Sequence, residues 1–251
     1  LMGILHLAIF LVGCLGLAAL ALRQRGTFLK RVGRFGFFMG LLLVIGSLLN
    51  GLWSCVIWGR LYFSTDYVFA GDGNAPFRED DVCQPLNVYG ESKLAGERYL
   101  RELSRNFLLI RTAWLYGPRG KNFVKTILEK AASVRTLKVV DDQIGSPTCT
   151  YDLAEAVKRL VEDGAKGIFH ITNGGSCSWY EFARAILEEA GVKGVEVLPV
   201  KSDEFPRPAK RPCFGVLDGS KFYKTTGITI RPWRMALRDC LPKIVGGKDK
   251  I

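Results

Sequence analysis

The pattern of apolar and polar residues divides the chain into two parts of unlike character near residue 60. Residues 1–22 are apolar except for His6, and residues 35–58 are nearly as apolar. From residue 60 onward, short apolar runs alternate with segments in which apolar residues recur every three or four positions. Such an alternation predicts strands followed by amphipathic helices, and therefore an α/β fold with a parallel sheet.

The second part is predicted to alternate between strands and helices along most of its length. Strands are expected within residues 60–69, 106–117 and 167–175. Helices are expected within residues 87–105, 120–133, 151–164 and 178–191. Ser178 is the predicted N-cap of the last helix, because a serine hydroxyl satisfies a free amide of the first turn.

Each of the two apolar runs is long enough to cross a bilayer of about 30 Å as a helix. The segment between them, residues 23–34, carries five positive charges and no negative charge. By the positive-inside rule this linker would be cytoplasmic, and everything after residue 58 would then lie outside. A membrane hairpin through residues 1–58 is one interpretation. A secretory signal is a weaker one, because the first run lacks a basic start.

The net charge of +11 over 251 residues is unevenly distributed. No Asp or Glu precedes Asp66, whereas six Lys or Arg residues do, so about half of the excess lies in the first quarter of the chain. The remainder is mildly basic, as suits a protein that handles a phosphate-bearing ligand. Nucleic acid is therefore not an expected partner.

The seven cysteines are scattered and form no C-x-x-C pair. An odd number without such spacing disfavours both a zinc site and a disulfide framework, so no metal site is expected. A reducing compartment fits this cysteine usage best.

Tyr89 and Lys93 stand four residues apart in the stretch LNVYGESKLAGE. Residues at i and i+4 share one face of a helix, so the Lys93 ammonium is expected to lie close to the Tyr89 phenol. A nearby cation favours the phenolate form of a tyrosine, which suits a group that donates or accepts a proton near neutral pH. The spacing alone is weak evidence, because a surface pair with this spacing often arises by chance.

The surroundings of this pair carry the specific signal. Thr65 stands 24 residues before Tyr89 at a predicted strand end, where α/β folds place catalytic groups. Further segments, in chain order, are LLIRTAWLYG, NFVKTILE, LKVVDDQIGSPT and RPAKRPCFGVLD. With STDYVF and PLNVYGESKLAGE, these segments resemble the extended short-chain dehydrogenases over residues 60–240, and within them the dTDP-4-dehydrorhamnose reductase family.

The resemblance implies a role for each residue around Tyr89. Tyr89 would donate a proton to the carbonyl oxygen of the sugar as hydride arrives from NADPH or NADH. Lys93 would assist Tyr89 and bind the nicotinamide ribose, and Thr65 would hydrogen-bond the same carbonyl oxygen. Ser64 would join Tyr89 and Lys93 in binding the cofactor. The implied reaction reduces dTDP-4-dehydro-L-rhamnose to dTDP-L-rhamnose in nucleotide-sugar biosynthesis.

The resemblance also implies residues that bind the dTDP-sugar substrate. Trp114 would pack against the deoxysugar, although a core aromatic residue is the alternative. Asp66 would contact the substrate or, as an alternative, order its own loop. Gln143 would line the sugar pocket or stabilise a turn. Arg207 and Arg211 would face the diphosphate, because a guanidinium fork matches phosphate geometry, unless they belong to a solvated basic loop.

The first part of the chain lacks the cofactor signature that this resemblance implies. A family member begins with a strand and then G-x-x-G-x-x-G at a helix N-terminus, where backbone N–H groups hold the pyrophosphate. Gly13 and Gly16 are present, but Phe10 stands in place of the first glycine, and no acidic residue follows at the expected distance. We therefore expect that residues 1–59 form no Rossmann unit and that the chain binds nicotinamide cofactor poorly.

The fold implied by the resemblance is a partial Rossmann-like parallel sheet with a substrate-binding lobe. It would occupy residues 60–246, preceded by two apolar helical segments within residues 1–59. A reading-frame error or gene fusion, a membrane hairpin and a divergent Rossmann half remain open as interpretations of residues 1–59, and we favour the first. A cytoplasmic location is expected, because the hairpin would export the reductase part away from nucleotide sugars. A homodimer is compatible with the family.

Two other functions remain open. One is a non-catalytic sugar-nucleotide-binding or regulatory subunit of the same fold, since a relative of the family is a regulatory subunit of methionine adenosyltransferase. The presence of Thr65, Tyr89 and Lys93 argues against it, because a binding module needs none of them. The other is a membrane-anchored sugar-nucleotide-binding protein, which cell fractionation would distinguish.

Overall fold

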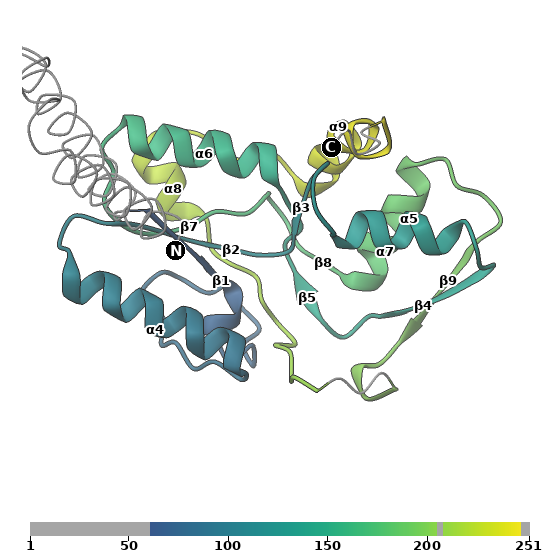
Figure 1. Ribbon diagram of the computed structural model, residues 1–251, viewed down its shortest axis with the longest axis horizontal. Coiled ribbons are helices and arrows are strands. Elements are labelled where there is room, and N and C mark those ends of the chain that lie inside the picture. Colours follow the sequence, from purple (N-terminus) through teal and green to yellow (C-terminus); the bar gives the residue numbers. More distant parts are fainter. Residues whose placement is uncertain (1–60, 205–207, 247–251) are drawn as a thin grey trace, which may run out of the picture. The chain divides into compact units, whose positions relative to one another are not determined.

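The computed structural model describes residues 61–204 and 208–246, in which three parallel strands form the largest sheet (Figure 1). Their order is β1, β2, β7, with bounds Leu61–Thr65, Leu108–Thr112 and Gly167–His170. Every residue of β2 is buried, as expected for a central strand of a parallel sheet. Because the strands are parallel, their carboxyl ends share one edge, with Thr65 opposite Thr112. Ligands of open α/β sheets bind at this edge.

Helices cover both faces of this sheet (Figure 1). The helices around it are α4 (Val88–Leu103), α6 (Thr150–Glu162) and α8 (Ser220–Thr226). On one face, Ile110 and Phe169 pack in an apolar cluster with Leu160 of α6 and Phe222 of α8. On the other face, Leu94 of α4 packs with residues that follow β1. The sheet therefore has a helix layer on each side, and α4 lies on the side opposite α6 and α8.

A second lobe is built on a two-stranded parallel sheet. Its strands are β4 (Thr136–Val140) and β9 (Glu196–Val200), and its helices are α5 (Phe123–Ala131), α7 (Trp179–Glu189) and α9 (Trp233–Gly246). Phe182 and Ile186 of α7 are fully buried in the apolar cluster that these elements share. Ser178 caps α7 in a capping box with Glu181, so the predicted N-cap is confirmed.

Two short strand pairings connect the three-stranded sheet to the second lobe. They are parallel β3 (Leu115–Tyr116) with β6 (Thr148–Cys149), and antiparallel β5 (Ile144–Gly145) with β8 (Cys177–Ser178). Two 3₁₀ turns complete the elements, η1 (Asp66–Val68) and η2 (Ser202–Glu204).

The α/β fold with parallel sheets is confirmed. The parallel pairing of β4 with β9 and the helices α8 and α9 were not predicted. The two apolar helical segments expected within residues 1–58 lie outside the described residues, as does the expectation that no Rossmann unit forms there. No helix in the described part of the chain is long and apolar enough to span a membrane.

Candidate active site

Thr65 lies at the carboxyl end of β1 and caps η1. Its Oγ1 accepts a hydrogen bond from the Tyr67 amide, with an N–O distance of 3.3 Å, and donates to Asp66 Oδ1 at 2.9 Å. Thr65 is buried, with 6% of its surface exposed. Its single hydroxyl proton is therefore directed toward a neighbouring carboxyl group.

Asp66 is almost fully buried, and its carboxyl Oδ2 faces the main chain at Gly215. A Cβ added at Gly215 would stand 2.5 Å from that oxygen, so a residue without a side chain is needed there. Burial disfavours the charged carboxylate and raises the pKa of Asp66 to about 7. The hydrogen bonds from Thr65 and from backbone amides act in the opposite direction, because they favour the ionised form. A proton is thus exchangeable near neutral pH directly beside Thr65.

Tyr89 is the second residue of α4, and about half of its surface is exposed, at 52%. Its ring meets the Tyr67 ring edge to face, with ring centroids 5.6 Å apart. A Cβ at Gly90 would overlap the Tyr67 carbonyl oxygen, so this glycine allows the start of α4 to approach η1 closely. Tyr67 thus contacts both the candidate catalytic tyrosine and Thr65.

Lys93 lies one turn after Tyr89 on the same helix and reaches the edge of β1. Its Nζ donates to the Phe63 carbonyl oxygen at 3.0 Å and stands 5.3 Å from the centre of the Tyr62 ring. Ser64, between these strand residues and Thr65, is buried, and its Oγ has no hydrogen-bond partner among the described residues. The structure therefore brings Ser64, Thr65, Tyr89 and Lys93 to one end of β1 and the facing part of α4.

A buried ion pair fastens α4 to the sheet. Glu97 stands on α4 two turns after Tyr89, and Arg111 lies within β2. Arg111 Nε donates to Glu97 Oε1 at 2.9 Å and Arg111 Nη2 donates to Glu97 Oε2 at 2.7 Å. Both side chains are at most 1% exposed. Because one buried charge without its partner is costly, this pair fixes where α4 lies on β2.

His170 completes this group, which we call the buried anchor: Glu97, Arg111 and His170. Burial and the neighbouring guanidinium lower the pKa of His170 to about 3, so the imidazole is neutral. Its Nδ1 is 3.0 Å from the Phe77 carbonyl oxygen, to which it must donate. Its Nε2 is then left as the acceptor for Arg111 Nη1 at 3.4 Å. The anchor is fully paired and has no contact with solvent.

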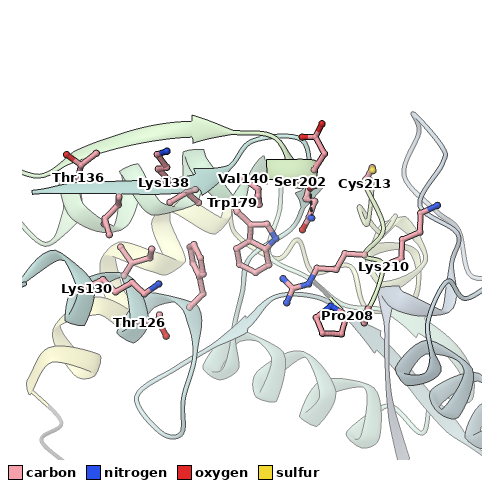
Figure 2. A pocket seen from close by; sticks show the side chains of 18 of the residues that line it. Thr126, Lys130, Thr136, Lys138, Val140, Trp179, Ser202, Pro208, Lys210 and Cys213 are labelled. Carbon is pink, nitrogen blue, oxygen red and sulfur yellow. Dashed lines mark hydrogen bonds between the residues drawn. The ribbon is translucent and has the colours of Figure 1, made fainter. Parts of the chain in front are cut away.

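A cavity of about 1050 Å³ opens in the second lobe, and we call it the basic cavity. Its walls come from α5, β4, η2, the start of α7 and the segment 208–213, and its cationic side chains are Lys130, Lys138, Lys210 and Arg211. In Figure 2 the Trp179 indole lies between α5 and the segment that carries Pro208 and Lys210. Asp203 is the acidic residue of this lining, so cations are in excess, and an aromatic surface in such a lining suits a ligand that has a ring and phosphate groups.

Two of the predicted substrate residues line the basic cavity, and one stands behind it. Gln143 and Arg211 belong to its wall. Gln143 Nε2 donates to Ser202 Oγ at 2.8 Å. Trp114 stacks on Trp179, with ring centroids 3.4 Å apart and planes 8° apart. Trp114 has a φ of 46°, which is unusual for a bulky residue. Arg207 lies outside the described residues.

Several residues of these two regions were not found from the sequence. Glu97 and Arg111 each had a signal, because Arg111 is a lone charge in an apolar run and Glu97 lies four residues after Lys93. Trp179 and the cavity lysines Lys130, Lys138 and Lys210 had no such signal in the sequence, because they come from segments far apart in the chain. No group of three or more His, Cys, Asp or Glu residues placed to hold a metal ion occurs in the described part of the chain, and the cysteines there are free.

Comparison with known proteins identifies the family. A model of the RmlD substrate binding domain matches residues 59–245. The chain belongs to this family. Among relatives of this RmlD-type chain, the spore coat polysaccharide biosynthesis protein SpsK of Bacillus subtilis is 47% identical over 181 residues, which cover 72% of this chain and 63% of that protein. A dTDP-4-dehydrorhamnose reductase of Mycolicibacterium smegmatis is 41% identical over 191 residues, covering 75% and 58%.

Solved structures agree with the RmlD assignment. The dTDP-4-dehydrorhamnose reductase of Clostridium acetobutylicum has a TM-score of 0.70 at 43% identity, covering 72% of this chain and 64% of that one. The reductase of Bacillus anthracis, solved in complex with NADP, has a TM-score of 0.70 at 39% identity, covering 72% and 64%. The RmlD-type chain thus spans less than two thirds of the length of these relatives.

Proposed function

We propose that residues 60–246 form the C-terminal part of an NAD(P)H-dependent dTDP-4-dehydrorhamnose reductase. The observation that supports the proposal is that Thr65 ends β1 at the carboxyl edge of the sheet, while α4, which carries Tyr89 and Lys93, packs against β1 and η1. Relatives that carry the reductase name support the reaction, and the Bacillus anthracis structure with NADP supports the cofactor class. The substrate would be a dTDP-sugar with a carbonyl group at carbon 4.

Tyr89 is the proposed proton donor to the carbonyl oxygen of the sugar. Its phenol is accessible, and it stands on a helix whose start is held against η1. Thr65 would hydrogen-bond the same oxygen, which requires its hydroxyl proton to turn away from Asp66 Oδ1. A protonated Asp66 allows this, because its own O–H can then donate to Thr65 Oγ1. We therefore assign Asp66 to the orientation of Thr65 rather than to the sugar.

The described residues fit the nicotinamide end of the cofactor. Lys93 Nζ donates to the carbonyl of Phe63 within β1, one residue before Ser64, whose buried hydroxyl lacks a partner among the described residues. A cofactor ribose beside Lys93 would give its ammonium a further hydrogen-bonding partner. When bound, NADPH or NADH supplies the hydride for the carbonyl carbon. Lys93 and Ser64 would hold the cofactor, and Tyr89 and Thr65 would control the proton.

The basic cavity is the proposed site for the nucleotide diphosphate. Its volume of about 1050 Å³ is suited to a ligand of that size. Arg211 and Lys210 would pair with the diphosphate, Trp179 would stack on a ring of the ligand, and Gln143 would contact a polar group of the sugar. Trp114 would support Trp179 from behind through their stacking contact.

The test is NADPH oxidation with dTDP-4-dehydrorhamnose by the full chain and by Tyr89→Phe. The variant should lower the rate by at least about 10²-fold, because a positioned proton donor contributes that much. Tyr99→Phe, an exposed tyrosine on the same helix, is the matched control and should not change the rate. Equal rates, measurable above the background without enzyme, for the wild-type chain and Tyr89→Phe would refute the assignment of Tyr89.

This assay, together with a measurement of dTDP binding, also distinguishes an impaired enzyme from a binding subunit. Turnover far below about one per second would agree with the expectation that this chain is impaired. Binding of dTDP without turnover, and without any effect of Tyr89→Phe, would favour the non-catalytic binding subunit. A cytoplasmic location, a homodimer and the preference between NADPH and NADH stay predictions.

A further inference from the structure

Asn87 uses both ends of its amide at the junction between α4 and the basic cavity. Its Oδ1 accepts a hydrogen bond from the Gly90 amide at 2.9 Å and so caps α4. Its Nδ2 donates to the Lys210 carbonyl oxygen at 2.8 Å, across 123 residues of sequence. One side chain thus joins the first turn of α4 to the segment 208–213.

Each of the two joined segments carries groups of one half of the proposed site. The first turns of α4 carry Tyr89 and Lys93. The segment 208–213 carries Lys210 and Arg211, whose side chains line the basic cavity. The bond from Asn87 is therefore a direct link between the proposed proton donor and the proposed diphosphate site.

Near Lys210 the cavity segment is held by the packing of buried Pro212 against Gly71 rather than by backbone hydrogen bonds. No backbone hydrogen bond joins residues 208–212 to another described residue. The chain is held again at Cys213, whose carbonyl accepts from the Ile144 amide at 2.7 Å, and at Phe214, whose amide donates to the Gly71 carbonyl at 3.0 Å. Asn87 therefore restrains the part of the segment whose side chains face the ligand.

We propose that Asn87 is a positioning residue that couples ligand binding in the basic cavity to the placement of the first turn of α4. The inference rests on the proposed function and adds a residue to it. A diphosphate held by Lys210 and Arg211 would fix their segment, and through the Lys210 carbonyl and Asn87 it would fix the turn that carries Tyr89. Substrate binding would then help to order the proton donor.

The chemistry of the amide gives a selective test. Serine at an N-cap accepts the same helix amide and adds no charge, but it is too short to reach the Lys210 carbonyl. Asn87→Ser should therefore keep the cap and lose the link. Asn106→Asp, at an exposed position between α4 and β2, controls for effects of substitution away from both segments.

The first measurement is dTDP binding to the full chain by calorimetry. We expect Asn87→Ser to weaken dTDP binding about fivefold, which corresponds to the loss of about one hydrogen bond. Arg211→Ala should weaken binding less in the Asn87→Ser background than in the wild-type background, because Asn87 acts through the segment that carries Arg211. Fully additive losses, or an unchanged affinity in Asn87→Ser, would overturn the coupling.

The second measurement is amide hydrogen exchange across residues 88–92 with and without dTDP. The wild-type chain should gain protection there when dTDP binds, and Asn87→Ser should gain none. An equal gain in both proteins would show that the link carries no coupling. If the wild-type chain binds no dTDP, the proposed function fails and the inference falls with it; if it binds dTDP and Asn87→Ser behaves like the wild-type chain, only the inference fails.

Discussion

Arg111 in the buried anchor and Arg211 at the basic cavity place the same guanidinium group in two different surroundings. Arg111 is fully buried, and Glu97 accepts two hydrogen bonds from it. Arg211 is partly exposed and makes no hydrogen bond or ion pair with another described residue. The bonding capacity of Arg111 is used within the fold, whereas that of Arg211 is available to a ligand.

The difference separates residues that hold α4 in place from residues proposed to bind the substrate. The anchor ties α4 to β2 through the ion pair of Glu97 with Arg111, and its removal should affect folding. The cationic side chains of the cavity make no hydrogen bond or ion pair with another described residue, so their removal should affect binding. Asp66 lies between these cases, because it is buried like Glu97 but has no cation at its side.

The largest effect should come from Arg111→Met. This change leaves Glu97 buried without a partner, and we expect the free energy of unfolding to fall by about 3–5 kcal/mol in urea denaturation. Arg159→Met, which breaks a surface pair with Asp163, should cost less than about 1 kcal/mol. The double variant Glu97→Leu with Arg111→Met should recover much of the loss. A small effect of Arg111→Met alone would contradict the anchor role.

Asp66 should make stability depend on pH. Its pKa is about 7 in the folded chain and near 3.8 when unfolded, so the folded chain binds the proton more tightly. The stability from this group is complete below about pH 4 and is lost as the pH rises through 7, in total on the order of 4 kcal/mol. In urea denaturation from pH 4.5 to 7.5, the wild-type chain should therefore lose stability relative to Asp66→Asn. Asp72→Asn, at an exposed site, is the control, and parallel curves for all three proteins would contradict the prediction.

Arg211→Ala should give the smallest effect in energy and the clearest contrast with Arg111. Calorimetry should show dTDP binding weakened about tenfold through loss of a charge-assisted contact. The free energy of unfolding should change by no more than about 0.5 kcal/mol, as for an ordinary surface substitution. Arg105→Ala, at an exposed position after α4, should change neither quantity. A large loss of stability in Arg211→Ala would remove the distinction between the two regions.

The local elements of the fold could be predicted because their signals are local. The start of α4 follows from Asn87 and the helical spacing after it, and the start of α7 follows from Ser178 and Glu181. The parallel pairing of β4 with β9 could not be predicted, because it joins segments about 60 residues apart and neither strand has a partner next to it in the chain.

The candidate site could be predicted where a short motif carries the chemistry. Tyr89, Lys93 and Thr65 follow from spacing and from a resemblance. The basic cavity could not be predicted, because its lysines come from α5, β4 and the segment before Cys213, which only the folded chain brings together. The contact between Trp114 and the sugar stays a prediction, and the structure adds that Trp114 stacks on Trp179, which lines the cavity.

Gly145 has a consequence for how this protein can change over evolution. A Cβ at this position would overlap the Trp114 indole, and Trp114 in turn stacks on Trp179 at the cavity wall. A new side chain at position 145 would therefore reshape a ligand site that it never touches. Positions 114, 145 and 179 should accept changes only as a set, so a library that varies them one at a time will miss the sequences in which all three are compatible.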